Sequence, residues 1–272
     1  MKAKKSLGQH FLKSERALRQ IVEAGNITPD DIVLEIGPGQ GVLTERLIAR
    51  AKKVIAIEKD RELIPILEEK FAGEIAAGKL EIIEQDILKF DPAVRQDLTG
   101  KRGYKLVANI PYYITGAIIE QFLSTTHQPS LMVLLMQKEV ADRIIARDHK
   151  ESILSIAIKA YGTPRIIDKV PPGAFAPAPT VDSSILLISM ISRDFFKDLS
   201  STTPGYDEKL FLSVMKAVFG RKRKQIGGSL AEYLDNKDRA IATLERASID
   251  PRTRPEDLTL ADWKNLAQSL ES

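Results

Sequence analysis

The chain has 272 residues, 43% of them hydrophobic and 28% charged with a formal net charge of +3, as is typical of a globular protein with one large or two smaller domains. It contains no cysteine, which excludes disulfides, thiolate metal sites and mechanisms that need a cysteine nucleophile. Because it has no run of about 18 apolar residues and its basic N-terminus lacks the apolar core of a signal peptide, we expect a cytoplasmic protein without a membrane partner.

The first predicted element is a helix from Ser14 to Ala24, where a serine N-cap precedes apolar residues at helical spacing. Apolar runs then alternate with amphipathic stretches in a βαβ pattern, which predicts a doubly wound, mostly parallel sheet of the Rossmann-like kind. The predicted strands cover residues 31–37, 53–60, 80–86, 104–111, 131–137 and 185–191, and the helices between them residues 41–50, 61–73 and 116–124. The segment "VPPGAFAPAPTVDS" is a proline-rich loop that is too rigid for a linker.

Strand signals end near Ser192, and the rest of the chain is predicted to form helices joined by short polar links. The predicted helices cover residues 206–220, 229–234, 237–247 and 260–270. We therefore expect a larger domain of residues 1–192 and a small all-helical domain of residues 193–272.

A glycine-rich turn, "EIGPGQG", follows the first predicted strand. Gly37, Gly39 and Gly41 allow a tight turn and a close approach of the backbone to a ligand. Such turns occur in dinucleotide-binding enzymes and in S-adenosylmethionine (SAM) enzymes alike, and a plain connection between strand and helix remains an alternative. The turn alone does not identify the ligand.

Three successive strands end in an acid or an amide, namely Glu58, Asp86 and Asn109. Because ligands of open α/β sheets bind at the carboxyl ends of the strands, we expect these side chains to line one site. Glu58 is suited to accept hydrogen bonds from ribose hydroxyls, and Asp86 from the exocyclic amine of an adenine. A dehydrogenase would explain Glu58 equally well, but it would not explain the segment that begins at Asn109.

That segment has the pattern Asn-apolar-Pro-aromatic, formed by Asn109, Ile110, Pro111 and Tyr112. The exocyclic amine of adenine is a poor nucleophile because its lone pair is delocalised into the ring. Acceptors on its hydrogens, here the Asn109 side-chain oxygen and the Ile110 carbonyl, would favour a tetrahedral nitrogen and stabilise the developing positive charge. Pro111 would fix the direction of that carbonyl, and Tyr112 would stack on a base taken out of its helix. The alternative is a purely structural role, in which the segment forms a proline turn and its tyrosines pack in the core.

Basic residues are clustered at two places, which suggests a polyanionic partner, although a solvated charged surface remains an alternative for each cluster. The first cluster is Lys2, Lys4 and Lys5, and the second is Arg221, Lys222, Arg223 and Lys224. Gly220, Gly227 and Gly228 flank the second cluster, which suits a loop or helix end close to a nucleic-acid backbone.

Together these motifs resemble those of the bacterial small-subunit (16S) rRNA adenine dimethyltransferases, the KsgA family. The resemblance covers nearly the whole chain and rests on "KKSLGQHFL", "EIGPGQGVLT", "NIPYYIT", "LMQKEVADRI", "FAPAPTVDS" and "VFGRKRKQIGGSL". It implies a SAM-dependent enzyme of ribosome biogenesis that dimethylates N6 of two adjacent adenosines in a hairpin near the 3′ end of 16S rRNA. Residues 1–192 would bind SAM and residues 193–272 would recognise the rRNA. We expect a monomer that uses no metal.

The resemblance also implies roles for individual residues. The implied cofactor-binding residues are His10, Leu12, Gly37, Gly39, Glu58, Asp86 and Asn109, with Gln9 nearby; the implied catalytic residues are Asn109, Ile110, Pro111, Tyr112 and Phe175; and the implied RNA-binding residues are Lys4, Lys5, Arg221, Lys222, Arg223 and Lys224. Phe175 would pack on the second face of the target base.

The sequence departs from the family pattern at two positions: Tyr113 stands where bacterial members often have Asn, and Gln85 where they often have Gly. Two alternatives stay open. One is a methyltransferase of large-subunit rRNA of the macrolide-resistance type, which shares the glycine turn and the Asn-Ile-Pro-Tyr pattern. The other is a non-catalytic ribosome-assembly or transcription factor on the same fold, against which the intact Asn-Ile-Pro-Tyr pattern argues.

Overall fold

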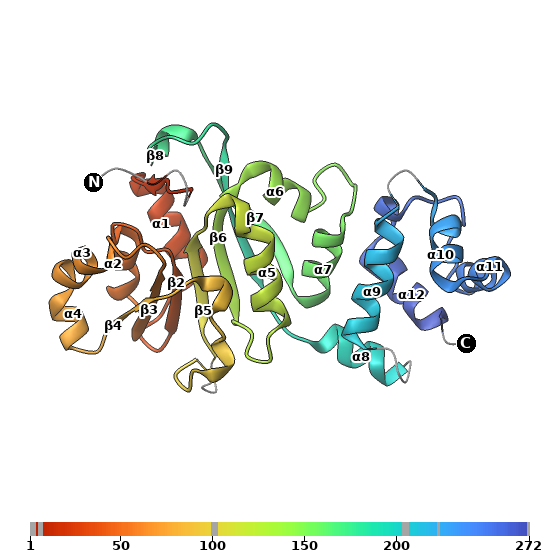
Figure 1. Ribbon diagram of the computed structural model, residues 1–272, viewed down its shortest axis with the longest axis horizontal. Helices are drawn as coiled ribbons and strands as arrows, with labels where there is room; N and C mark the ends of the chain where they lie inside the picture. Colours follow the sequence, from red (N-terminus) through yellow and green to blue (C-terminus); the bar gives the residue numbers. More distant parts are fainter. Residues whose placement is uncertain (1–3, 5–7, 99–102, 203–206, 222–223, 271–272) are drawn as a thin grey trace. The chain divides into compact units, whose positions relative to one another are not determined.

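A computed structural model describes residues 4, 8–98, 103–202, 207–221 and 224–270 (Figure 1). Its internal packing divides the chain into two compact units, residues 1–141 with 163–191 and residues 142–162 with 192–272. The first unit contains the sheet and the second is helical. Residues 142–162, which lie inside the larger domain expected from the sequence, pack with the C-terminal helices, and a separate function for each unit stays a prediction.

The first unit is built on a seven-stranded sheet with the strand order β4-β3-β2-β5-β6-β9-β7 (Figure 1). The strands from β4 to β6 run parallel, and β9 lies antiparallel between β6 and β7. The strands are β2 (Ile32–Ile36), β3 (Lys53–Glu58), β4 (Leu80–Glu84), β5 (Lys105–Asn109), β6 (Leu131–Gln137), β7 (Thr163–Val170) and β9 (Ser183–Ser189). A separate antiparallel pair joins β1 (Phe11–Leu12) to β8 (Phe175–Ala176). The predicted doubly wound sheet is confirmed.

Helices cover both faces of the sheet. The helices are α1 (Glu15–Ala24), α2 (Val42–Ile48), α3 (Ile64–Lys70), α4 (Ala72–Ala76) and α5 (Thr115–Ser124), followed in the chain by α6 (Lys138–Ile144), whose last three residues belong to the second unit. Helix α1 begins after Ser14, whose side chain accepts from the Ala17 N–H, and packs against β6, β7 and β9. Val54 and Ala56 face the core that contains α1, while Ile55 points to the opposite face and is equally buried. Burial on both faces explains the continuous apolar runs of these strands.

The chain order of the strands changes direction next to β2. From β2 the chain proceeds to β3 and β4 on one side and then returns to β5 on the other side. The carboxyl ends of β2 and β5 therefore flank a topological switch point, where ligands of such sheets bind.

The sequence predicted no strand at β7 and no helix at α8 (Asp194–Thr202). Strand β7 contains charged residues and Pro164, which has no N–H to donate. It lies at the edge of the sheet, where such residues are tolerated, so the usual apolar signal is missing.

The helical unit is packed around aromatic side chains. Its remaining helices are α7 (Ile153–Tyr161), α9 (Glu208–Phe219), α10 (Ile226–Leu234), α11 (Lys237–Arg246) and α12 (Leu260–Ser269). Phe219 and Trp263 stack with ring centroids 5.3 Å apart, and Trp263 is buried. Within the described residues, no helix combines the length and the apolar character needed to cross a membrane.

Candidate active site

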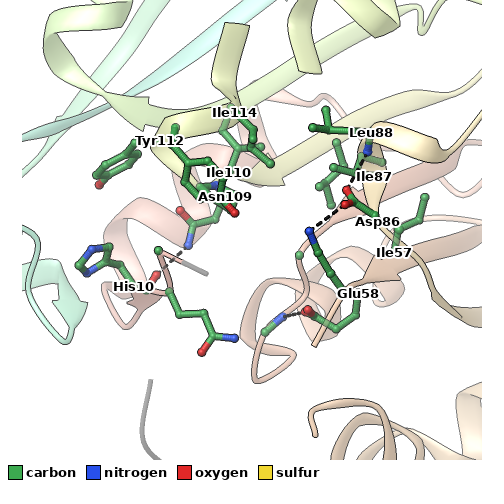
Figure 2. Close-up of a pocket in the computed structure, with 18 of the residues that line it drawn as sticks. His10, Ile57, Glu58, Asp86, Ile87, Leu88, Asn109, Ile110, Tyr112 and Ile114 are labelled. Atoms are coloured by element: carbon green, nitrogen blue, oxygen red, sulfur yellow. Dashed lines mark hydrogen bonds and ion pairs between the residues drawn. The ribbon is translucent and has the colours of Figure 1, made fainter. Parts of the chain in front are cut away.

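A cavity of about 160 Å³ opens at the carboxyl ends of β2, β3, β4 and β5, at the switch point of the sheet (Figure 2). Most residues predicted for the site lie on its wall. The predicted residues that line it are His10, Gly37, Gly39, Glu58, Asp86, Asn109, Ile110, Pro111 and Tyr112. The structure therefore brings together side chains from five separate segments of the sequence.

Glu58 ends β3 and is almost fully buried. Its two oxygens accept hydrogen bonds from the protein's own backbone. One bond comes from the Gly39 N–H at 3.2 Å (Figure 2), and the other comes from the Asp60 N–H at 2.8 Å. Burial raises the pKa of Glu58, while these backbone donors favour the carboxylate. A carboxylate has about four lone-pair positions, so both oxygens can still accept from a ligand.

Asp86 follows β4 and is held by two donors. Its side chain accepts from the Leu88 N–H at 3.1 Å and from Lys59 Nζ at 2.7 Å (Figure 2). The Lys59 ammonium lowers the pKa of Asp86, so this carboxyl is ionised at neutral pH and its orientation is set before any ligand arrives.

The glycine turn connects β2 to α2 with backbone angles that favour glycine. Gly37 and Gly39 have φ angles of +66° and +60°. A Cβ atom at Gly39 would lie 3.1 Å from the Phe11 ring, so a side chain there would also disturb the N-terminal segment. The turn thus presents bare backbone to the cavity, as the sequence predicted.

Asn109 ends β5 and its amide is oriented by the N-terminal segment. Asn109 Nδ2 donates to the His10 carbonyl at 3.0 Å (Figure 2). One of the two amide hydrogens is used in this way, and Oδ1 is left as an acceptor on the cavity wall. His10 is itself held by its Nδ1, which donates to the Pro177 carbonyl at 2.8 Å.

The segment after Asn109 presents an aromatic ring. The Ile110 N–H donates to the Leu135 carbonyl at 3.2 Å, which fixes the peptide between Asn109 and Ile110. The Tyr112 hydroxyl lies 2.7 Å from Ser183 Oγ, and its ring is nearly parallel to that of His10, with centroids 6.0 Å apart and an interplanar angle of 18°. Tyr112 is therefore anchored at its hydroxyl with one ring face toward His10.

A buried carboxylate that sequence reasoning missed ties the N-terminal segment to the end of β3. Asp60 is 3% exposed and accepts from Lys4 Nζ at 2.6 Å and from Gln9 Nε2 at 2.8 Å. The Lys4 N–H in turn donates to Gln9 Oε1 at 2.8 Å. The only signal in the sequence was an acid just after a strand, and its partners lie more than fifty residues away in the chain.

Two of the residues predicted for the site, Leu12 and Phe175, do not line this cavity. The two residues that depart from the family pattern, Tyr113 and Gln85, do line it. Phe175 and Leu12 are paired in the β1–β8 ribbon and are buried in the core, at 5% and 6% exposure. Tyr113 is largely exposed at the rim, and Gln85 lies on the wall with its amide donating to the Lys89 carbonyl. The role predicted for Phe175 at the target base stays a prediction.

The predicted RNA-binding residues are only partly described. Lys5, Lys222 and Arg223 lie outside the described residues. Lys4 pairs with Asp60 and Glu62, and Arg221 and Lys224 both pair with Glu232. Of the flanking glycines, Gly227 packs on Pro251, and its N–H donates to the Pro251 carbonyl at 2.9 Å. This glycine is therefore needed for packing within the helical unit.

The arrangement as a whole suits a ligand with a ribose and an adenine on one side and a hydrogen-bond donor on the other. Acids with fixed oxygens stand at β3 and β4, and an amide oxygen stands at β5 next to an aromatic ring. Among the described residues, no group of three or more acidic or histidine side chains is placed to hold a metal ion.

Comparison with known proteins identifies relatives along the full chain. Residues 1–272 match the family model described as ribosomal RNA adenine dimethylase. Ribosomal RNA small subunit methyltransferase A of Dehalococcoides mccartyi is 42% identical over 268 residues, which are 98% of this chain and 88% of that protein. The protein of the same name from a Geobacillus species is 38% identical over 276 residues, covering 98% and 91%. These matches confirm the family predicted from the motifs.

Solved structures confirm the Rossmann-like fold. A dimethyladenosine transferase from Plasmodium falciparum has a TM-score of 0.77 at 27% identity, covering 94% of this chain and 96% of that one. The 23S rRNA methyltransferase ErmE has a TM-score of 0.72 at 24% identity, covering 96% and 100%, and this likeness shows the fold alone.

Proposed function

Because the chain belongs to the ribosomal RNA adenine dimethylase family, whose methyl donor is SAM, we propose that it dimethylates N6 of two adjacent adenosines in a hairpin near the 3′ end of 16S rRNA. Its substrate would be the small ribosomal subunit or a precursor of it. The relatives of highest identity described above are named for the small subunit, which favours this substrate over large-subunit rRNA. We further propose that the protein acts as a monomer in the cytoplasm, where this substrate is assembled.

The observation that carries the proposal is the orientation of Asn109. Its Nδ2 is used by the His10 carbonyl, so Oδ1 remains for a hydrogen of the target amine. The second hydrogen of the target amine would be donated in a hydrogen bond to the Ile110 carbonyl. With both hydrogens held, the nitrogen lone pair would be directed toward the methyl donor, and the same two oxygens would stabilise the positive charge that develops.

The residues of the cavity also fit SAM as the ligand. Two carboxylates with free lone pairs stand at neighbouring strand ends, Glu58 for the two ribose hydroxyls and Asp86 for the adenine amine. Backbone without Cβ atoms lies at Gly37 and Gly39, where the methionine part would pass. Tyr112 would stack on the flipped target base, a contact worth about 1–3 kcal/mol.

The direct test is to map the methylated nucleotides. Small ribosomal subunits that lack the modification, and large subunits as a control, would be incubated with the protein and methyl-labelled SAM. We expect N6,N6-dimethyladenosine at two adjacent positions near the 3′ end of 16S rRNA and no label in large-subunit rRNA. Label in large-subunit rRNA alone would support the macrolide-resistance alternative, and binding to subunits without any label would support an assembly factor.

We also propose that the basic run from Arg221 to Lys224 contacts rRNA phosphates. Two of its members share Glu232 as a partner, so part of the charge is offset within the protein. Each phosphate neutralised adds about 0.7–0.9 to the slope of log affinity against log salt. Replacing all four residues by Ala should weaken RNA binding and flatten that slope without changing SAM affinity. The Glu232→Ala variant should steepen it, and unchanged slopes in both variants would assign the run to the solvated surface.

A further inference from the structure

Tyr113 is an exposed aromatic residue at the rim of the main cavity, and the proposed reaction gives it no role. It follows Tyr112 in the short 3-10 helix η4 (Tyr112–Ile114), and both tyrosines line the cavity. Tyr112 is partly buried and its hydroxyl lies 2.7 Å from Ser183 Oγ, whereas Tyr113 is 65% exposed. The two consecutive rings therefore have different surroundings, and the second ring shows most of its surface to the solvent.

The ring of Tyr113 is supported by the N-terminal segment. A Cβ atom at Gly8 would lie 3.3 Å from Tyr113 Cε1, 3.5 Å from its Cδ1 and 3.8 Å from Pro111 Cβ. Gly8 has a φ angle of +61°, so both the backbone angle and the closeness of the ring favour glycine there. Because the protein already supports one edge of the ring, a ligand that stacks on it has to restrict little further motion.

A charged side chain near Tyr113 is already engaged within the protein. The hydrogen bond to Asp86 raises the pKa of Lys59, and the nearby Tyr113 hydroxyl adds to the rise. Lys59 Nζ lies 2.7 Å from Asp86, so its charge is used inside the cavity. What Tyr113 offers to a ligand is therefore a ring face, which suits a flat group such as a nucleobase.

The proposed substrate has a flat group at the corresponding place. When one base is taken out of its stack, the next base in the strand loses a stacking partner on one face, which is part of the free-energy cost of flipping. An aromatic ring at the rim can cover that face and replace the lost contact. The two target adenosines are adjacent, so whichever one is in the cavity, the other is its neighbour.

We propose that Tyr113 stacks on the adenine next to the one that is being methylated. One adenosine of the pair is held by Asn109 and Tyr112, the other lies on the Tyr113 ring, and the two exchange places when the second is methylated. The contact strengthens binding of the flipped substrate and leaves the cofactor untouched. This inference rests on the proposed function, because it needs a substrate with two adjacent adenosines.

A double-mutant cycle between protein and RNA tests this contact. Small subunits are reconstituted with intact 16S rRNA, or with an abasic nucleotide in place of either one of the two adenosines, so that the other is the only target. The measured quantity is the subunit concentration that half-saturates the first methyl transfer. On intact subunits, Tyr113→Ala should raise this concentration about fivefold or more, because one contact between a base and an aromatic ring is lost. On both abasic subunits the same variant should stay within about twofold of the native protein, since the base that Tyr113 would contact is absent.

Two further variants sharpen the test. Tyr113→Phe keeps the ring and should behave as the native protein on all three substrates. Ile66→Ala truncates an exposed apolar side chain on α3 that does not line the cavity, and it should also match the native protein.

Several results would overturn the inference. Tyr113→Ala would have to show no loss on intact subunits, or a loss that persists on either abasic subunit. An equal loss for Tyr113→Phe would assign the effect to the hydroxyl, and weaker SAM binding by Tyr113→Ala in calorimetry would place the ring over the cofactor. If the native protein transfers no methyl group to intact subunits, the proposed function itself is contradicted.

Discussion

The main cavity has a cofactor half, which contains Glu58 and Asp86, and a target half, which contains Asn109 and Tyr112. The two halves differ in the hydrogen-bonding groups that they leave free for a ligand. In the cofactor half, Glu58 and Asp86 each accept hydrogen bonds from the protein's own donors, so their positions are set in advance. In the target half, Asn109 uses its donor within the protein and keeps its acceptor on the cavity wall. If the two halves bind the cofactor and the target base as proposed, cofactor affinity and transfer rate should depend on separate residues and should respond separately to mutation.

The largest expected effect is on the target half. Asn109→Ala should lower the rate of methyl transfer by about 100-fold or more, because a positioned acceptor for the developing charge is lost. SAM affinity should change less than about threefold. Single-turnover transfer and calorimetry measure the two quantities. A variant that loses SAM binding yet transfers at the native rate when saturated would show that Asn109 belongs to the cofactor half.

On the cofactor half, Glu58→Ala should weaken SAM binding by roughly 1–3 kcal/mol, through loss of hydrogen bonds to a charged acceptor. The rate at saturating SAM should stay close to native, which is the reverse of the Asn109 result. Glu84→Ala, which removes a half-exposed acid at the end of β4 that does not line the cavity, is the matched control and should leave affinity unchanged.

A variant at Asp60 tests whether the cofactor half and the target half of the cavity function independently. Burial opposes its ionisation, but hydrogen bonds from Lys4 and Gln9 outweigh this and lower its pKa. Asp60→Asn should loosen the segment that carries His10, and so both weaken SAM binding and slow transfer by about three- to tenfold. Glu62→Gln removes only the exposed partner of Lys4 and should change neither quantity. An effect of Asp60→Asn on affinity alone would show that the segment does not position Asn109.

Because the pKa of Asp60 is lowered, its ion pairing contributes stability that is present above its unfolded pKa of about 3.9 and is lost as the pH falls through the lowered value. Native protein should therefore lose more thermal stability than Asp60→Asn between about pH 5 and pH 2. Parallel melting curves for the two proteins over that range would contradict this.

The smallest effect is expected for the Tyr112 hydroxyl. Tyr112→Phe loses its contact with Ser183 but keeps the ring, so transfer should stay within about threefold of native. Tyr112→Ala should cost about 1–3 kcal/mol of base stacking. If both variants lose activity equally in the transfer assay, the hydroxyl and not the ring face is the important part of Tyr112.

Local patterns in the sequence were sufficient for the parts of the fold and site that follow a strand or begin a helix. The acids and the amide at the ends of β3, β4 and β5 were predicted because parallel strands bring their carboxyl ends to one edge. Ser14 was predicted because capping depends on residues only three positions apart.

Features that depend on distant pairing could not be predicted in this way. Asp60 gains its role from Lys4 and Gln9, and no periodicity links those positions. Phe175 lies in a two-residue strand whose burial depends on pairing with β1.

The bond from His10 to the Pro177 carbonyl spans 167 positions of the chain. A ribosome synthesises the chain from its N-terminus, so the segment that carries His10 leaves the exit tunnel long before its partner exists. Until Pro177 has been made, His10 lacks this anchor, although Lys4 and Gln9 can already hold the segment to Asp60. A nascent chain therefore completes its cavity only after almost the whole first unit has been translated.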